Sequence, residues 1–86
     1  MKKLLRELTV SHVVPPGSKS RIDNHPKLAD HTIVYAAYPD GKRNEKLFVP
    51  PHLADRARIG EPFQAVVQKQ RYPDRRTFID VVEEIL

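Results

Sequence analysis

Proline is spread so evenly through this chain that long helices are excluded almost everywhere. Eight prolines, at positions 15, 16, 26, 39, 50, 51, 62 and 73, leave no proline-free stretch longer than thirteen residues, apart from the fourteen residues before the first. A proline inside a helix removes a backbone hydrogen bond and clashes with the preceding turn. We therefore expect a mainly β protein made of short strands and tight turns.

The segments between the prolines have the composition of strands. They alternate apolar and polar residues or are rich in β-branched and aromatic side chains. The predicted strands span residues 4–14, 32–38, 45–49, 63–71 and 77–85. In the first of them, period two places one set of side chains on a common face: Leu8, Val10, His12 and Val14.

Two of these segments also fit a helix. Residues 2–7 could form one helical turn, because Leu4, Leu5 and Leu8 share a helical face. Apolar residues in 77–85 also fall at helical spacing, but isoleucine and valine are stiff at χ1 and favour strand there.

The connections have recognisable turn and helix signals. Residues 39–42, Pro-Asp-Gly-Lys, predict a turn, because proline sets the first corner and Gly41 tolerates positive φ. Residues 52–59 predict a short helix that ends at Gly60 and turns three side chains inward: Leu53, Ala57 and Ile59.

Length and composition place further limits on the chain. Its 86 residues predict a single domain over 1–86, and the absence of cysteine excludes disulfides and thiolate metal sites. No apolar run approaches the roughly 20 residues that a membrane-spanning helix needs. We expect a cytoplasmic protein with no membrane partner.

Three stretches give the chain the layout of a small barrel. They are TIVYAAY-PDGKRNE-KLFV at 32–49, HLADRARIGEPFQAVVQ at 52–68 and RTFIDVVEEI at 76–85. The chain resembles the OB-fold, a five-stranded barrel, with one short helix between strands three and four. SH3-like barrels and ligand-binding barrels of the TOBE type share the pattern at Ile59-Gly60-Glu61. The OB resemblance implies binding of oligonucleotides or oligosaccharides on strands two and three, between the loops 15–31 and 69–76.

Positive charge gathers where that groove would lie. The chain has 15 Lys and Arg against 11 Asp and Glu, a formal charge of +4. The local excess is +3 in residues 69–76, +1 in 15–31 and +1 in 40–46, whereas Asp80, Glu83 and Glu84 make the last strand acidic. Such a distribution is compatible with a nucleic-acid partner.

Aromatic residues accompany these cations. Tyr72 lies in the most basic turn, while Tyr35 and Tyr38 are three residues apart and should point to opposite faces. Phe48 either completes a stacking platform or lies in the core. The predicted nucleic-acid-binding residues are Lys19, Arg21, Tyr35, Tyr38, Lys42, Arg43, Lys69, Arg71, Tyr72, Arg75 and Arg76.

Catalytic and metal-binding motifs are not recognisable. The four histidines lack the spacing that suits zinc, and the serines lack a nucleophile-elbow context. The chain has no phosphate loop and no dinucleotide fingerprint. We therefore expect no enzyme activity, cofactor or metal.

The function that follows is non-catalytic binding of single-stranded DNA or RNA with little sequence preference. The alternative is a protein-interaction module or a subunit of a larger assembly, with a partner or a second copy pairing at a sheet edge near Leu86. A sensor of small molecules or oligosaccharides is a third interpretation.

Overall fold

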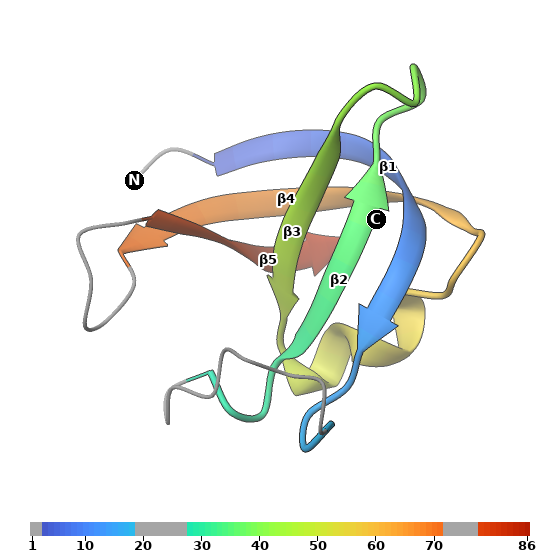
Figure 1. The fold of residues 1–86 in the computed structure, drawn as a ribbon. Helices are drawn as coiled ribbons and strands as arrows, with labels where there is room; N and C mark the ends of the chain where they lie inside the picture. The colour runs from blue at the N-terminus through green and yellow to red at the C-terminus, as the bar shows by residue number, and fades with distance from the viewer. Residues whose placement is uncertain (1–2, 19–27, 72–77) are drawn as a thin grey trace.

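Five strands and one short helix form the described part of the chain, residues 3–18, 28–71 and 78–86 of a computed structural model (Figure 1). The elements are β1 (Lys3–Val14), β2 (Thr32–Ala37), β3 (Asn44–Val49), the 3₁₀ helix η1 (Pro51–Arg56), β4 (Pro62–Arg71) and β5 (Phe78–Ile85). The expected mainly β architecture is confirmed. Both segments that also fitted a helix are strands in the structure.

The strands close into a barrel in the order β1-β2-β3-β5-β4, with β4 returning to β1. Neighbouring strands are antiparallel except β3 and β5, which run parallel. The long, curved β1 has two neighbours, because residues 3–9 pair with β4 and residues 9–14 pair with β2 (Figure 1). Closure therefore depends on one strand that changes partner along its length.

Apolar side chains that alternate along the strands fill the barrel interior. On β2, Val34 and Ala36 are completely buried, as are Leu47 and Val49 on β3. They belong to one cluster with Leu8, Val10, Ala57, Phe63, Ala65, Val67, Val82 and Ile85. Burial of these side chains is the main source of stability in so small a domain.

A second buried cluster covers the outer face of β2, β3 and β5. Ile33, Phe48 and Val81 adjoin interior residues in sequence and so point away from the lumen. Val14 and Leu28 complete the cluster, with Tyr35 and Ile79 packed against it. Leu28 precedes β2, so the connection between β1 and β2 supplies part of this outer layer.

A β-bulge in β1 corrects the expected placement of His12. The register with β2 shifts between Val10 and His12. Because an inserted residue reverses the alternation of a strand, Val10 faces the lumen, whereas the exposed His12 and the buried Val14 both lie on the outer face. The prediction that all four alternate residues share one face was therefore wrong at His12 and Val14.

The helix is shorter than the sequence indicated. It spans Pro51–Arg56 and ends at Ala57, where the backbone becomes extended. Ala57 is buried and Leu53 half-buried as expected, but Ile59 is 63 % exposed. Gly60 follows with φ of +85° and donates its N–H to the Val10 carbonyl at 2.7 Å, which holds Ile59 in an outward turn. No helix in residues 3–18, 28–71 and 78–86 is long and apolar enough to cross a bilayer.

The predicted turn between β2 and β3 is confirmed. Gly41 adopts φ of +70°, and its N–H donates to the Tyr38 carbonyl at 2.9 Å. The Lys42 N–H donates to the Asp40 carboxylate at 2.9 Å. These local bonds set the register of the central hairpin.

Two leucines provide a matched test of the barrel core. Leu47 is completely buried, whereas Leu5 on β1 is 59 % exposed. We expect Leu47→Ala to lower the free energy of unfolding by about 2–5 kcal/mol and Leu5→Ala by less than about 0.5 kcal/mol. Urea unfolding followed by circular dichroism measures both. Equal losses of unfolding free energy in the two variants would contradict the burial of Leu47 in the barrel interior.

Candidate functional site

A row of three polar side chains crosses the outer face of the barrel. His12 on β1 is the direct partner of Tyr35 on β2, and Tyr35 is the direct partner of Lys46 on β3. The His12 and Tyr35 ring centroids are 6.1 Å apart, with the ring planes tilted by 33°. We call these three residues the outer row.

The buried outer cluster supports this row from below. Phe48 is only 2 % exposed, and the Lys46 ammonium lies 5.5 Å from the centre of its ring. Tyr35 packs against the same cluster and is half-buried, while His12 is exposed. Phe48 is thus a buried support on the outer face, whereas Tyr35 and His12 keep accessible ring surface.

A second polar assembly closes one end of the barrel. The Arg6 guanidinium lies 3.0 Å from the Glu45 carboxylate and 3.4 Å from that of Asp80. Arg6 belongs to β1, and its two partners belong to β3 and β5, neither of which is a neighbour of β1. The contacts must therefore span the lumen, and we call this end the barrel mouth.

The network at the mouth extends to the β2–β3 hairpin on one side and to β4 on the other. Tyr38 donates its hydroxyl to Glu45 at 2.9 Å, and the Arg43 guanidinium lies 4.4 Å from the centre of the Tyr38 ring. On the other side the Lys69 ammonium is 3.4 Å from the second Asp80 oxygen. A chain of contacts thus connects the β2–β3 hairpin with the end of β4.

Burial makes these charges interdependent. The side chains of Arg6 and Asp80 are each 12 % exposed. The buried Asp80 Oδ1 makes no hydrogen bond, so the nearby Lys69 ammonium is its compensation. Burial raises the pKa of Tyr38 above its ordinary value of 10.0, and the hydrogen bond to Glu45 raises it further, against the opposing charge of Arg6.

The structure connects only part of the predicted site. Tyr38, Arg43 and Lys69 belong to the mouth network, while Tyr35 lies on the other face of β2, as its spacing from Tyr38 predicted. Lys42 is exposed in the hairpin turn. The remaining predicted residues lie outside the described part of the chain: Lys19, Arg21, Tyr72, Arg75 and Arg76. Arg71 is exposed at the end of β4.

Several residues at the outer row and the barrel mouth were not predicted from the sequence. His12 was expected on one face with Leu8 and Val10, because no sequence signal indicates the bulge. Lys46 was counted only as charge, although its place two residues before Phe48 puts both on one face. Phe78 is 65 % exposed and is the direct strand partner of Arg71.

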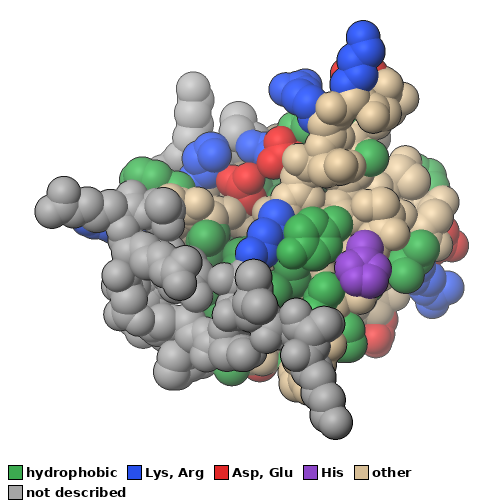
Figure 2. Space-filling model, viewed as in Figure 1, with side chains coloured by type: hydrophobic (Ala, Val, Ile, Leu, Met, Phe, Trp, Pro, Cys, Tyr) green, Lys and Arg blue, Asp and Glu red, His purple; other side chains and the backbone are tan. Residues whose placement is uncertain are grey.

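The space-filling view agrees with this arrangement. Figure 2 shows acidic side chains between Lys and Arg side chains at the upper left, near the base of the β2–β3 hairpin. Cations extend from the hairpin tip, and a cation, hydrophobic side chains and a histidine follow one another across the centre.

Metal ligands do not gather in the described ranges 3–18, 28–71 and 78–86. No group of three or more His, Asp or Glu side chains is arranged there to hold an ion. His31 instead makes a 2.9 Å contact with the neighbouring Asp30 carboxylate.

Comparison with known proteins found no matching family model, no matching curated protein and no matching solved structure.

The raised pKa of Tyr38 predicts a specific loss of stability in alkali. The protonated phenol is favoured in the fold, so its contribution is fully present below the ordinary pKa and is lost as pH rises through the raised one. We expect the free energy of unfolding to fall more steeply above about pH 10 than in Tyr38→Phe. Urea titrations across this range measure the difference, and parallel pH profiles would refute it.

Removal of the central cation should be costly. Arg6→Met would leave the Glu45 and Asp80 carboxylates at the mouth without their shared partner, so we expect a loss of about 2–4 kcal/mol in unfolding free energy. The exposed Arg71→Met is the matched control and should change it by less than about 0.5 kcal/mol. Chemical denaturation at neutral pH measures the unfolding free energy of both variants. Similar losses in the two would exclude a structural role for the network.

Proposed function

We propose that this chain binds single-stranded nucleic acid, DNA or RNA, without catalysis and with little sequence preference. The observation that carries the proposal is the outer row, in which a histidine, a tyrosine and a lysine are direct cross-strand partners on three adjacent strands. Two rings and one positive charge thus lie side by side across one face. Single strands are bound without sequence readout by this combination.

The geometry of Tyr35 suits stacking. Its ring packs on the buried outer cluster on one side, which limits its rotation and lowers the entropy lost on binding. A base stacked on an aromatic side chain contributes about 1–3 kcal/mol. His12 provides a second flat ring at 6.1 Å, within the distance at which neighbouring rings can share one ligand strand.

Cations border this face on two sides. Lys42 and Arg43 lie at the β2–β3 turn, and Lys69 and Arg71 lie near the end of β4. All four are exposed, and Arg43 and Lys69 are also oriented by contacts with the Tyr38 ring and the Asp80 carboxylate. Phosphate contacts from such residues would make binding fall steeply with salt.

The proposal includes assignment of the barrel to the OB type. Two features support it: the short helix between β3 and β4, and the closed five-stranded arrangement. In OB-folds the face of strands two and three binds the ligand between the loops that follow strands one and four. The outer row lies on that face, and Lys19, Arg21, Tyr72, Arg75 and Arg76 belong to those loops as further predicted contacts.

Tyr35 offers a sharp test of stacking. Tyr35→Leu keeps an apolar contact with the outer cluster but removes the ring, so we expect about 5–30-fold weaker binding. Tyr35→Phe keeps the ring and should bind nearly as the parent does. Fluorescence anisotropy with labelled oligothymidylate and oligouridylate, at low and moderate salt, measures both.

Two controls accompany this experiment. Arg58→Gln alters an exposed cation beyond η1 and should leave affinity unchanged. Circular dichroism checks that each variant is folded. Absence of binding by the parent chain at about 50 mM salt would end the proposal, and equal affinity of the Leu and Phe variants would remove Tyr35 from the site.

A further inference from the structure

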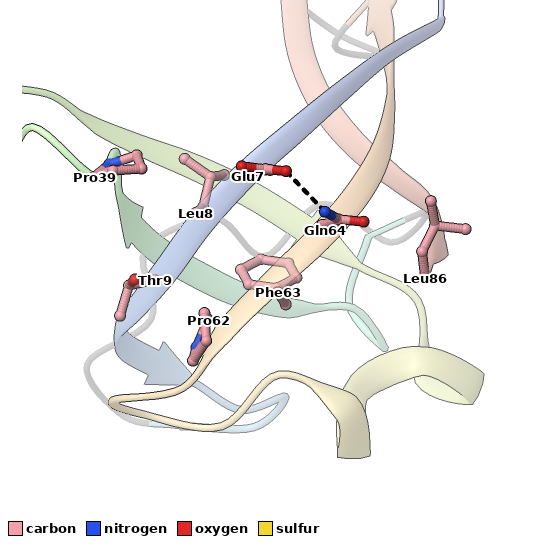
Figure 3. Close-up of a pocket in the computed structure, with 8 residues that line it drawn as sticks. All are labelled: Glu7, Leu8, Thr9, Pro39, Pro62, Phe63, Gln64 and Leu86. Atoms are coloured by element: carbon pink, nitrogen blue, oxygen red, sulfur yellow. Dashed lines mark hydrogen bonds between the residues drawn. The ribbon is translucent and has the colours of Figure 1, made fainter.

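The outer face of β1 and β4 carries a groove that is separate from the outer row. It has a volume of about 400 Å³ and lies over the paired strands (Figure 3). Its lining residues come from β1, β4, the β2–β3 turn and the end of the described chain: Glu7, Leu8, Thr9, Pro39, Pro62, Phe63, Gln64 and Leu86. The volume is sufficient for a large apolar side chain and part of its backbone.

Direct strand partners build the walls of the groove. Glu7 is opposite Gln64, and the Gln64 amide donates to the Glu7 carboxylate at 2.7 Å across the upper end (Figure 3). Thr9 is opposite Pro62 at the lower end. Pro39 and Leu86 stand on the two sides. The Leu86 N–H donates to the Gln64 carbonyl at 2.9 Å, which fixes that side wall.

The surroundings are unusually apolar for an exposed surface. Leu5 and Leu86 are 59 % and 58 % exposed, and Leu5 is the direct partner of the half-buried Val66. Leu5 lies two residues before Glu7, so both point to the same face. Exposed apolar side chains that flank a groove are typical of interaction sites.

Acidic side chains lie at and beside the groove, with the exposed Arg58 bonded through its carbonyl to the Glu61 N–H. Glu7 is the charged residue among the lining residues. Glu84 is the direct partner of Val66, and Glu61 precedes Pro62. All three are acidic and exposed. The Glu7 carboxylate in the lining favours a cation over a phosphate as the group bound here.

We propose that this groove docks an extended segment of a partner protein in which a lysine or arginine lies between two apolar side chains. Along β1, the exposed Leu5 is followed two residues later by Glu7, and two residues after that by Thr9 in the groove. An extended segment presents alternate side chains at about 7 Å, which matches this order of apolar, cationic and apolar contacts. Glu7 recognises the cation, and the Gln64 amide holds its carboxylate in place.

This occupant differs from a nucleic acid and from a second copy of the chain. The groove shares no lining residue with the outer row, so its occupant can be tested separately from nucleic-acid binding. A contact of this size is small, and affinities in the micromolar to millimolar range are expected.

Chemical-shift perturbation on the full ¹⁵N-labelled chain tests the proposal. The probe is a short synthetic peptide with the sequence Leu-Lys-Leu between glycine and serine flanks, compared with the same peptide carrying Leu-Glu-Leu. We expect the lysine peptide to shift the amides of Leu5, Glu7, Gln64, Val66 and Leu86, and the glutamate peptide to shift none of them.

Variants make the test specific. Glu7→Lys should weaken the affinity for the lysine peptide by about fivefold or more and confer binding of the glutamate peptide. Leu86→Ser should weaken the lysine peptide, whereas Ile59→Ser, at an equally exposed apolar residue beyond η1, should not. Persistence of the backbone amide pattern shows that each variant is folded.

Three results would overturn the proposal. The first is no shift at millimolar peptide, and the second is equal binding of the two peptides by the parent chain. The third is dimerisation in sedimentation equilibrium that Leu86→Ser abolishes, which would make a second copy the occupant. None of them depends on nucleic-acid binding.

Discussion

Closure of the barrel rests on the parallel pairing of β3 with β5, which involves the residue pairs Leu47–Asp80 and Phe48–Val81. This pairing is short, yet both sides of the sheet depend on it. Towards the lumen it places the Asp80 carboxylate where Arg6 can reach it together with Glu45. Towards the outside it brings Phe48 and Val81 into one buried cluster. Barrel closure, the ion network and the outer layer therefore form one cooperative arrangement.

The two ends of the barrel interior differ in polarity. Towards η1 the interior is apolar, with Ala57 buried and Leu53 packed against the core. At the mouth the interior positions of β1, β3 and β5 carry charge instead, because that end opens towards water. Buried ions are costly unless paired, and here two cations face two carboxylates, with Tyr38 completing the hydrogen bonding. The network adds specificity to strand pairing, since a one-residue slip would separate Arg6 from its partners.

Opposite surfaces of this small barrel have opposite chemistry. The outer face of β1–β3 offers rings and positive charge, which suit a polyanion with flat bases. The outer face of β1 and β4 offers leucines and acids around a groove, which suit a basic protein segment. Because β1 changes neighbours along its length, its two halves contribute to different surfaces: His12 to one and Glu7 to the other. A single bent strand thereby connects two candidate binding sites.

Local chemistry determined the strands, the Pro39–Lys42 turn and the place of the short helix, because proline positions, β-branched runs and a turn glycine act over a few residues. It also determined that Tyr35 and Tyr38 lie on opposite faces. Tertiary structure alone decided the bulge that exposes His12, the pairing of β3 with β5 and the meeting of Arg6 with Glu45 and Asp80. These depend on strands far apart in the chain, and no local pattern specifies which cations and acids will face one another across a closed lumen.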